Sequence, residues 1–326
     1  MPAWIIALSF IVSLGSTLTT IHFMIPLLSN ARLTGEDLNK LKRPDVPEMG
    51  GLGTIVGISA GFVLILGANA FLGIPLEDVG VLGVFATVLT VGLIGVFDDL
   101  LDISQLIKAF TPALAATPLI AINAGVSMLK IPLIGNIELG LIYPLILVPL
   151  GITGAANAFN MLAGFNGMEA GTGLVAAVSL TIVAWVSNSM TAFLMLVIAV
   201  GALLGTLYFN WFPAKVLIGD VGTLTIGAIL ASAVIVGDFE MAGLIIVIPH
   251  FVDFLFKIFH GLPSGGWGGE LNYEKGVNKL QCSGKVVGLP QFIMKITGGI
   301  TERNLTLVVM GLEAVVGLIA IVIYIY

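Results

Sequence analysis

The stretch NAFNMLAGFNGMEAG, residues 157–171, interrupts an almost continuous apolar sequence with three asparagines, a glutamate and three glycines. The segments on either side, 139–156 and 172–186, are apolar, and the first is long enough to cross a membrane. Asn157 and Asn160 stand three residues apart, so on a helix they share one face. Amides at the mouth of an apolar helix cost free energy unless they bind something. We therefore interpret this stretch as half of a ligand site at a membrane surface.

The composition indicates a membrane protein with several spans. Of 326 residues, 58% are hydrophobic and 10% are charged, whereas average chains carry about 25% charged residues. We treat residues 1–326 as one integral membrane domain. The apolar run 4–28 lacks a basic leader and a small-residue cleavage site, so we expect it to be a retained first span. The one cysteine, Cys282, excludes an internal disulfide.

Ten segments are apolar and long enough to serve as transmembrane helices of roughly 20 residues. Between the fourth and fifth segments, residues 131–139 contain a proline, a glycine and an asparagine, which fits a small hairpin. The predicted fold class is an all-α polytopic membrane protein with about ten helices and a short external β-hairpin. The predicted spans are 3–28, 50–72, 80–97, 109–125, 141–161, 168–187, 190–210, 221–236, 241–260 and 303–325.

Basic residues divide unequally between the two sets of loops that ten spans create. Twelve of the thirteen fall on one side, and only Lys130 falls on the other. Because lysine and arginine are enriched in cytoplasmic loops, this side is predicted to be cytoplasmic, with both termini external. Asp98, Asn157, Asp220 and the polar loop 36–48 share that side, so we expect an active site at the cytoplasmic face. The twelve residues are Arg32, Lys40, Lys42, Arg43, Lys108, Lys215, Lys257, Lys275, Lys279, Lys285, Lys295 and Arg303.

Asp98 and Asp99 place adjacent carboxylates at the end of a predicted span. Paired carboxylates can hold Mg²⁺, accept a proton or position a basic partner. Lys108 follows at the start of the next helix, where an ammonium could hold a phosphate. The alternative is a solvated loop that only ends the helix. Because other polar motifs lie on the same predicted side, we favour a functional site over a solvated loop.

Two further polar stretches border the same face. Asp220 opens a predicted span between Gly219 and Gly222, which allow a ligand to approach the backbone closely. Asp220 could instead be an N-cap that stabilises the helix by about 1 kcal/mol. Glu48 follows the basic loop 36–47, which is either the rim of a pocket or a surface attracted to anionic lipid.

His250, Asp253 and Lys257 lie at helical spacings within the ninth predicted span. Asp253 and Lys257 are four residues apart, so a neutralising pair inside the membrane is the favoured interpretation. A catalytic role for His250 is the alternative. The sequence contains no Cys/His cluster of the zinc-binding type, no nucleophile elbow and no P-loop pattern.

Taken in order, the chain carries Phe97-Asp98-Asp99, Asn157-x-x-Asn160, Gly164-x-Asn166-Gly167-x-Glu169-Ala170-Gly171 and Gly219-Asp220. In this order the motifs resemble the polyprenyl-phosphate N-acetylhexosamine-1-phosphate transferases over about residues 30–260. Glu36-Asp37-Leu38-Asn39-Lys40 and Val46-Pro47-Glu48 look like the first cytoplasmic loop of the dolichyl-phosphate GlcNAc-1-phosphate transferase branch. Ala163 also favours that branch, because bacterial branches usually carry an aspartate there.

The resemblance implies transfer of GlcNAc-1-phosphate from UDP-GlcNAc to a polyprenyl (dolichyl) phosphate, giving GlcNAc-diphospho-polyprenol and UMP. It implies Mg²⁺ as cofactor, with Mn²⁺ as a substitute. The expected partners are the two substrates and the membrane but no nucleic acid, and the oligomeric state is left open, with a homodimer as one option. By matching positions, Asn160 and Asp220 would bind the metal, Lys108 and Asn157 the lipid phosphate, Glu36, Asp37, Leu38, Glu48 and Asn166 the UDP-sugar, and Asp98 and Asp99 would form the essential catalytic pair.

The last predicted cytoplasmic loop departs from that family. Its eukaryotic branch carries an Arg-His-Arg type motif there for sugar recognition, whereas residues 261–270 here read GLPSGGWGGE. The sugar specificity is therefore open to another UDP-sugar. His260, Trp267, Lys275 and Lys279 are candidates to replace the missing contact.

Two other classes of protein remain as alternatives. An intramembrane prenyltransferase would also use aspartates to bind Mg²⁺, and Asp98-Asp99-x-x-Asp102 superficially fits, but the required second aspartate-rich motif is not found. A lipid or sugar transporter would explain ten helices. It predicts polar residues near the centres of spans, however, whereas the polar motifs here gather at one face.

Overall fold

The computed structural model describes the chain except residues 102, 126–127, 132–134, 261–268, 275–276 and 326. Its helices are α1 (Ala3–Asn30), α2 (Gly51–Leu72), α3 (Asp78–Leu101), α4 (Gln105–Ala115), α5 (Thr117–Ala121), α6 (Val148–Met161), α7 (Met168–Val186), α8 (Met190–Asn210), α9 (Gly219–Gly237), α10 (Glu240–Ile246), α11 (Ile248–His260), α12 (Leu289–Thr297) and α13 (Glu302–Ile325). A π-helical turn, η1 (Tyr143–Leu147), precedes α6. The strands are β1 (Thr34–Glu36), β2 (Asp45–Pro47), β3 (Met128–Ile131), β4 (Gly135–Glu138), β5 (Glu270–Glu274) and β6 (Val277–Gln281), paired in sequence as three antiparallel hairpins.

The long helices form a bundle around α9, which packs against α2, α3, α6, α7 and α8. Small residues let these backbones approach closely, as is common between membrane helices. A Cβ added to Gly95 would lie 2.4 Å from Cα of Val221, and one on Gly227 would lie 2.3 Å from the carbonyl oxygen of Ala155. Glycine at Gly95 of α3 and Gly227 of α9 therefore allows α3 and α6 to pack closely against the central helix.

The predicted fold class is confirmed. Eight helices in the described part of the chain are long and apolar enough to cross a membrane. The predicted span 241–260 is instead a pair, α10 and α11, bent by 53° at a break. The predicted span 109–125 is shorter than expected, because the apolar helical segment covers only 106–121 as α4 and α5. Helix α12 lies outside the ten predicted spans, in a segment for which no helix is predicted from hydropathy.

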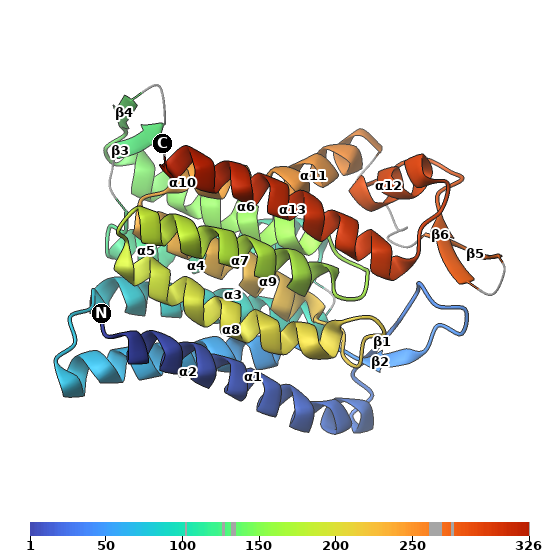
Figure 1. Cartoon of the computed structure of the whole chain (residues 1–326), viewed down its shortest axis with the longest axis horizontal. Coiled ribbons are helices and arrows are strands. Elements are labelled where there is room, and N and C mark those ends of the chain that lie inside the picture. The colour runs from blue at the N-terminus through green and yellow to red at the C-terminus, as the bar shows by residue number, and fades with distance from the viewer. Residues whose placement is uncertain (102, 126–127, 132–134, 261–268, 275–276, 326) are drawn as a thin grey trace.

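The two ends of the bundle differ. Figure 1 shows the β1–β2 and β5–β6 hairpins together at one end, and the β3–β4 hairpin with both chain termini at the other. The hairpin expected at 131–139 is present but begins earlier, with Met128 paired to Glu138. This arrangement agrees with the predicted partition of the loops, since Lys130 belongs to β3 and lies at the end opposite the β1–β2 loop.

Candidate active site

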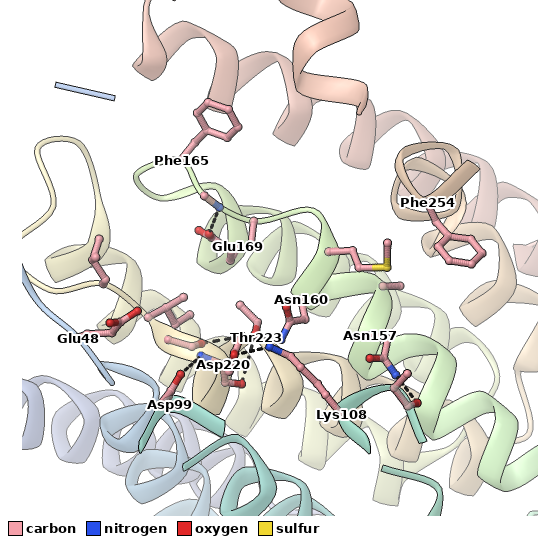
Figure 2. Close-up of a pocket in the computed structure, with 18 of the residues that line it drawn as sticks. Glu48, Asp99, Lys108, Asn157, Asn160, Phe165, Glu169, Asp220, Thr223 and Phe254 are labelled. Carbon is pink, nitrogen blue, oxygen red and sulfur yellow. Dashed lines mark hydrogen bonds and ion pairs between the residues drawn. The ribbon is translucent and has the colours of Figure 1, made fainter. Parts of the chain in front are cut away.

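A cavity of about 1080 Å³ opens at the end of the bundle that carries the β1–β2 loop. One part is polar, and Figure 2 shows Phe254 of α11 on the side away from Glu48 and Asp99. The other part is lined by apolar side chains of α4, α6 and α11, among them Leu106, Leu150 and Phe251. Of the eleven predicted site residues, all but Asp98 line this one cavity. The ten are Glu36, Asp37, Leu38, Glu48, Asp99, Lys108, Asn157, Asn160, Asn166 and Asp220.

The start of α9 is built around Asp99. The Asp99 carboxylate accepts hydrogen bonds from the backbone N–H groups of Asp220, at 2.7 Å, and Val221, at 3.1 Å. These are otherwise unpaired donors of the first helical turn, so Asp99 caps α9 from another helix. Gly219 has φ +70°, and a Cβ there would lie 2.7 Å from Oδ2 of Asp99. A glycine is therefore needed where the chain turns into α9, and Asp99 fixes the position of Asp220.

Asp220 is the meeting point of the polar groups in the cavity. Nδ2 of Asn160 donates to Oδ1 of Asp220 at 2.7 Å, and the Lys108 ammonium bonds to Oδ2. Lys108 also pairs with Oδ2 of the buried Asp98, at 2.5 Å. Figure 2 shows Lys108, Asn160 and Asp220 converging on one point. Asp98 is buried and does not line the cavity, but its ion pair orients Lys108, which does.

Carboxylates outnumber cations on the cavity wall. Among the described lining residues, Lys108 is the one cation. Burial and then the negative charge of Asp220 raise the pKa of the Glu48 carboxyl. An anionic ligand would meet repulsion here unless a bound cation intervened. The carboxylates are Glu36, Asp37, Glu48, Asp99, Glu169 and Asp220.

Asn157 and Asn166 line the cavity while holding its walls together. Nδ2 of Asn157 donates to the carbonyls of Ala109, at 3.0 Å, and Thr153, at 2.9 Å, and so ties α6 to α4. The amide oxygen of Asn166 accepts from the Ala214 N–H at 2.9 Å. Both side-chain amides thus form hydrogen bonds within the protein. In Asn157 these bonds use Nδ2, so Oδ1 is the atom that can accept a hydrogen bond from a ligand.

Glu169 is a cavity residue to which the sequence analysis gave no role of its own. It lies in the first turn of α7, is buried, and accepts the Gly164 N–H at 2.7 Å. This bond shapes the turn between α6 and α7 that carries Asn166. The signal was a carboxylate in a glycine-rich turn directly before an apolar helix, which is the pattern of a helix start.

Two of the four candidates to replace the missing sugar contact can be compared with the cavity wall, His260 and Lys279. Trp267 lies outside the described residues, and so does Lys275. Nδ1 of His260 is 2.8 Å from the Phe256 carbonyl of its own helix. Neither His260 nor Lys279 is among the described residues that line the cavity.

The α11 cluster, defined as His250, Asp253 and Lys257, is buried, and none of its three residues is among the described residues that line the cavity. Lys257 pairs with Asp253 at 2.6 Å, so the predicted i,i+4 ion pair is confirmed. The ring of His250 packs on Phe159 with centroids 4.0 Å apart, and Nδ1 lies 3.6 Å from the Glu313 carboxylate. These contacts favour the structural interpretation of His250.

Comparison with known proteins identifies the family of this chain. The family described as Glycosyl transferase family 4 matches residues 81–238. A Sulfolobus acidocaldarius protein, provisionally named a UDP-N-acetylglucosamine–dolichyl-phosphate N-acetylglucosaminephosphotransferase, is 33% identical over 322 residues, which cover 97% of this chain and 95% of that protein. The chain belongs to glycosyl transferase family 4.

Other relatives extend across two kinds of family member. The Dictyostelium discoideum UDP-N-acetylglucosamine–dolichyl-phosphate N-acetylglucosaminephosphotransferase is 27% identical over 373 residues, with 96% of this chain and 88% of that protein covered. A phospho-N-acetylmuramoyl-pentapeptide-transferase of Halalkalibacterium halodurans is 30% identical over 268 residues, covering 74% and 78%. The matched residues 81–238 contain Asp99, Lys108, Asn160 and Asp220. The centre of the cavity thus falls within the part of the chain that defines the family.

Proposed function

We propose that this integral membrane protein transfers GlcNAc-1-phosphate from UDP-GlcNAc to a polyprenyl, specifically a dolichyl, phosphate. The products are GlcNAc-diphospho-polyprenol and UMP, and the reaction is the first step of lipid-linked oligosaccharide assembly for N-glycosylation. The observation that carries the proposal is one cavity with a polar part and an apolar part. A polyprenyl tail cannot leave the bilayer and a nucleotide sugar cannot enter it, so both substrates can meet only in such a cavity at the membrane surface.

The polar residues suit a divalent cation, Mg²⁺ or Mn²⁺ in its place. Asn160 and Asp220 would hold it, since carboxylate and amide oxygens are the ligands these ions prefer and the two side chains are already 2.7 Å apart. The Asn160 amide would present its oxygen rather than its nitrogen for this purpose. When bound, the cation neutralises the diphosphate and polarises its phosphorus–oxygen bonds. The excess of carboxylates on the wall supports this assignment, because the donor is itself an anion.

Lys108 is assigned to the phosphate of the lipid acceptor. Its ammonium lies between Asp98 and Asp220, on the α4 helix that also contributes the apolar Leu106. A phosphate held by Lys108 would therefore face the metal-binding pair while its polyprenyl tail followed the apolar wall. Asn157, one turn of α6 before Asn160, would bind the same phosphate.

We propose that Asp98 and Asp99, predicted as the catalytic pair, serve the reaction as positioning residues for the groups they hold. Asp98 orients Lys108, and Asp99 caps the helix that presents Asp220. The acceptor phosphate is already an anion near neutral pH, so direct in-line attack on the donor phosphorus needs no strong base. The remaining predicted donor contacts, Glu36, Leu38 and Glu48, line the polar part of the cavity.

The orientation in the membrane is part of the proposal. The β1–β2 and β5–β6 hairpins lie at one end of the bundle (Figure 1) and carry Lys40, Lys42, Arg43 and Lys279, so this end would face the cytoplasm. Cys282 is the one cysteine of the chain and follows β6 at that end. A membrane-impermeant maleimide added to intact cells is expected to leave it unlabelled, and labelling before lysis would reverse the orientation.

The test of the reaction is release of UMP by purified protein in detergent with Mg²⁺ and dolichyl phosphate. UDP-GlcNAc and UDP-GalNAc are compared as donors, and Asp220→Ala serves as the inactive control. UMP with UDP-GlcNAc alone is expected. Release of UMP with another donor only would support the same enzyme class but a different sugar specificity. A folded protein that releases no UMP, yet moves substrate across vesicles, would instead support a transporter.

A further inference from the structure

Lys40 lies at the centre of a buried network outside the cavity wall. Its ammonium is 3.0 Å from Oδ2 of Asp37 and 3.1 Å from Oδ1 of Asn166, and it also pairs with the Glu302 carboxylate. It lies 4.6 Å from the centroid of the Phe212 ring as well. Lys40 and Glu302 are not among the described residues that line the cavity, whereas Asp37 and Asn166 are.

The network joins three segments that are far apart in the sequence. Lys40 and Asp37 belong to the β1–β2 loop, Asn166 to the turn between α6 and α7, and Glu302 to the start of α13. Glu302 also accepts the backbone N–H of Asn166 at 2.8 Å, and Nδ2 of Asn166 donates to Asp37 at 3.2 Å. Each of the two cavity residues is thus held from behind by the same ion pair.

The charge of Lys40 is what makes the arrangement stable. The side chains of Asp37 and Glu302 are 4% and 3% exposed, so both carboxylates have little access to water. Two carboxylates in such surroundings repel one another, and removing their shared cation leaves buried charges without compensation. Without Lys40, the β1–β2 loop would lose its ion pair with α13, and Asp37 and Asn166 would lose a shared partner, although Nδ2 of Asn39 would still donate to the Gly164 carbonyl of the α6–α7 turn at 2.8 Å.

The position of the network assigns it to one substrate. The polyprenyl chain requires the apolar wall formed by α4, α6 and α11, and Lys108 lies at that wall. Asp37 and Asn166 come from other segments and line the polar part of the cavity. Groups that hold these two residues should therefore affect a polar, uridine-containing donor more than the lipid acceptor.

We propose that Lys40 and Glu302 are positioning residues for the UDP-sugar donor, which fix Asp37 and Asn166 in their binding geometry. This inference rests on the proposed function for the identity of the donor. The two residues touch no reacting atom, so their loss raises the KM and the Kd for the donor while the KM for the acceptor stays the same.

The experiment uses the full chain in detergent and compares Lys40→Met, Lys40→Arg and Glu302→Gln with Lys42→Met. Lys42 is an exposed cation of the same loop and provides the matched control. Donor and acceptor KM values are measured by UMP release, and the Kd for UDP-GlcNAc by calorimetry without acceptor. Lys40→Met is expected to weaken donor binding by about tenfold or more, equivalent to about 1.4 kcal/mol. Lys40→Arg restores most of it, and Lys42→Met behaves as wild type.

A double variant protects the test against loss of folding. Glu302→Gln keeps an acceptor for the Asn166 N–H and leaves Lys40 paired with Asp37. In Lys40→Met/Glu302→Gln one of the two buried carboxylates is gone, so its loss of donor affinity should be less than the sum of the single losses. An unchanged donor Kd in both Glu302→Gln and the double variant would overturn the inference, as would equal rises in both KM values. Wild-type protein that binds UDP-GlcNAc but releases no UMP would overturn the proposed function alone, because the Kd comparison still tests the positioning role.

Discussion

Lys108 and Lys257 are both paired with aspartates near the same face, yet their surroundings differ. Lys108 bridges Asp98 and Asp220 and lines the cavity. Lys257 is 4% exposed and bonds to Asp253 and to the Met161 carbonyl at the end of α6. The first lysine can exchange a protein partner for a ligand, whereas the bonds of the second fasten α11 to α6.

The partners of the two aspartates extend the contrast. Oδ1 of Asp253 accepts the Leu289 N–H at 2.7 Å, which ties α11 to the start of α12. Oδ1 of Asp220 accepts from Asn160, another residue on the cavity wall. The same two residue types therefore have different roles, and access to the cavity is the distinguishing feature. Substitutions in the two pairs should accordingly separate activity from stability.

The largest effect is expected for Asp220→Ala. Loss of the proposed metal ligand should reduce Mg²⁺-dependent UMP release by about 10²–10³-fold, the range seen when one group that stabilises transition-state charge is removed. The melting temperature should stay close to that of wild type, because Lys108 keeps Asp98 as a partner. Substantial remaining activity would refute the metal assignment.

Lys257→Met is the corresponding change in the structural pair. It leaves Asp253 buried without its cation, and breaking a buried pair in this way typically costs 3–5 kcal/mol, so we expect a loss of about 3 kcal/mol in unfolding free energy. Thermal unfolding in detergent measures it, and Lys257→Met/Asp253→Asn should recover part of the loss. A variant with normal stability but no turnover would place Lys257 in the catalytic machinery instead.

Lys108→Ala should act mainly on the lipid acceptor. The KM for dolichyl phosphate is expected to rise by about tenfold, the effect of losing about 1.4 kcal/mol of binding, while the KM for UDP-GlcNAc changes little. Initial rates at varied concentrations of each substrate provide the measurement. An unchanged acceptor KM would exclude this role for Lys108.

The smallest effect is expected for Glu48→Gln, and its sign is opposite to that of Lys257→Met. Burial and the charge of Asp220 raise the pKa of Glu48, so the folded protein binds that proton more tightly than the unfolded chain. The stability contributed by the proton is lost as pH rises through the folded pKa. The glutamine variant should therefore melt at a higher temperature than wild type at pH 8, and the difference should shrink toward about pH 4. Activity should fall, and a lower melting temperature at pH 8 would contradict this reasoning.

Several features were predictable because they depend on one segment at a time. The length of an apolar run determines whether a helix can span, so most of the predicted spans match helices. The Asp253–Lys257 pair follows from helical spacing alone. The bend between α10 and α11 does not show in the hydropathy along 241–260, although Pro249, two residues after the break at Val247, is the residue type that interrupts a helix.

The sequence by itself determined that this is a polytopic membrane protein with several polar motifs between its apolar segments, and its resemblance to a known family pointed to ten residues that line the cavity. Only the tertiary structure decided how those residues are used. Asp99 caps a helix that begins at Gly219, and Glu302 holds Asn166 from a helix that starts well over a hundred residues later. Hydrophobicity and helical spacing are local properties of the chain, whereas the partner of a buried charge is chosen by which segments the packing of α9 against its neighbours brings together.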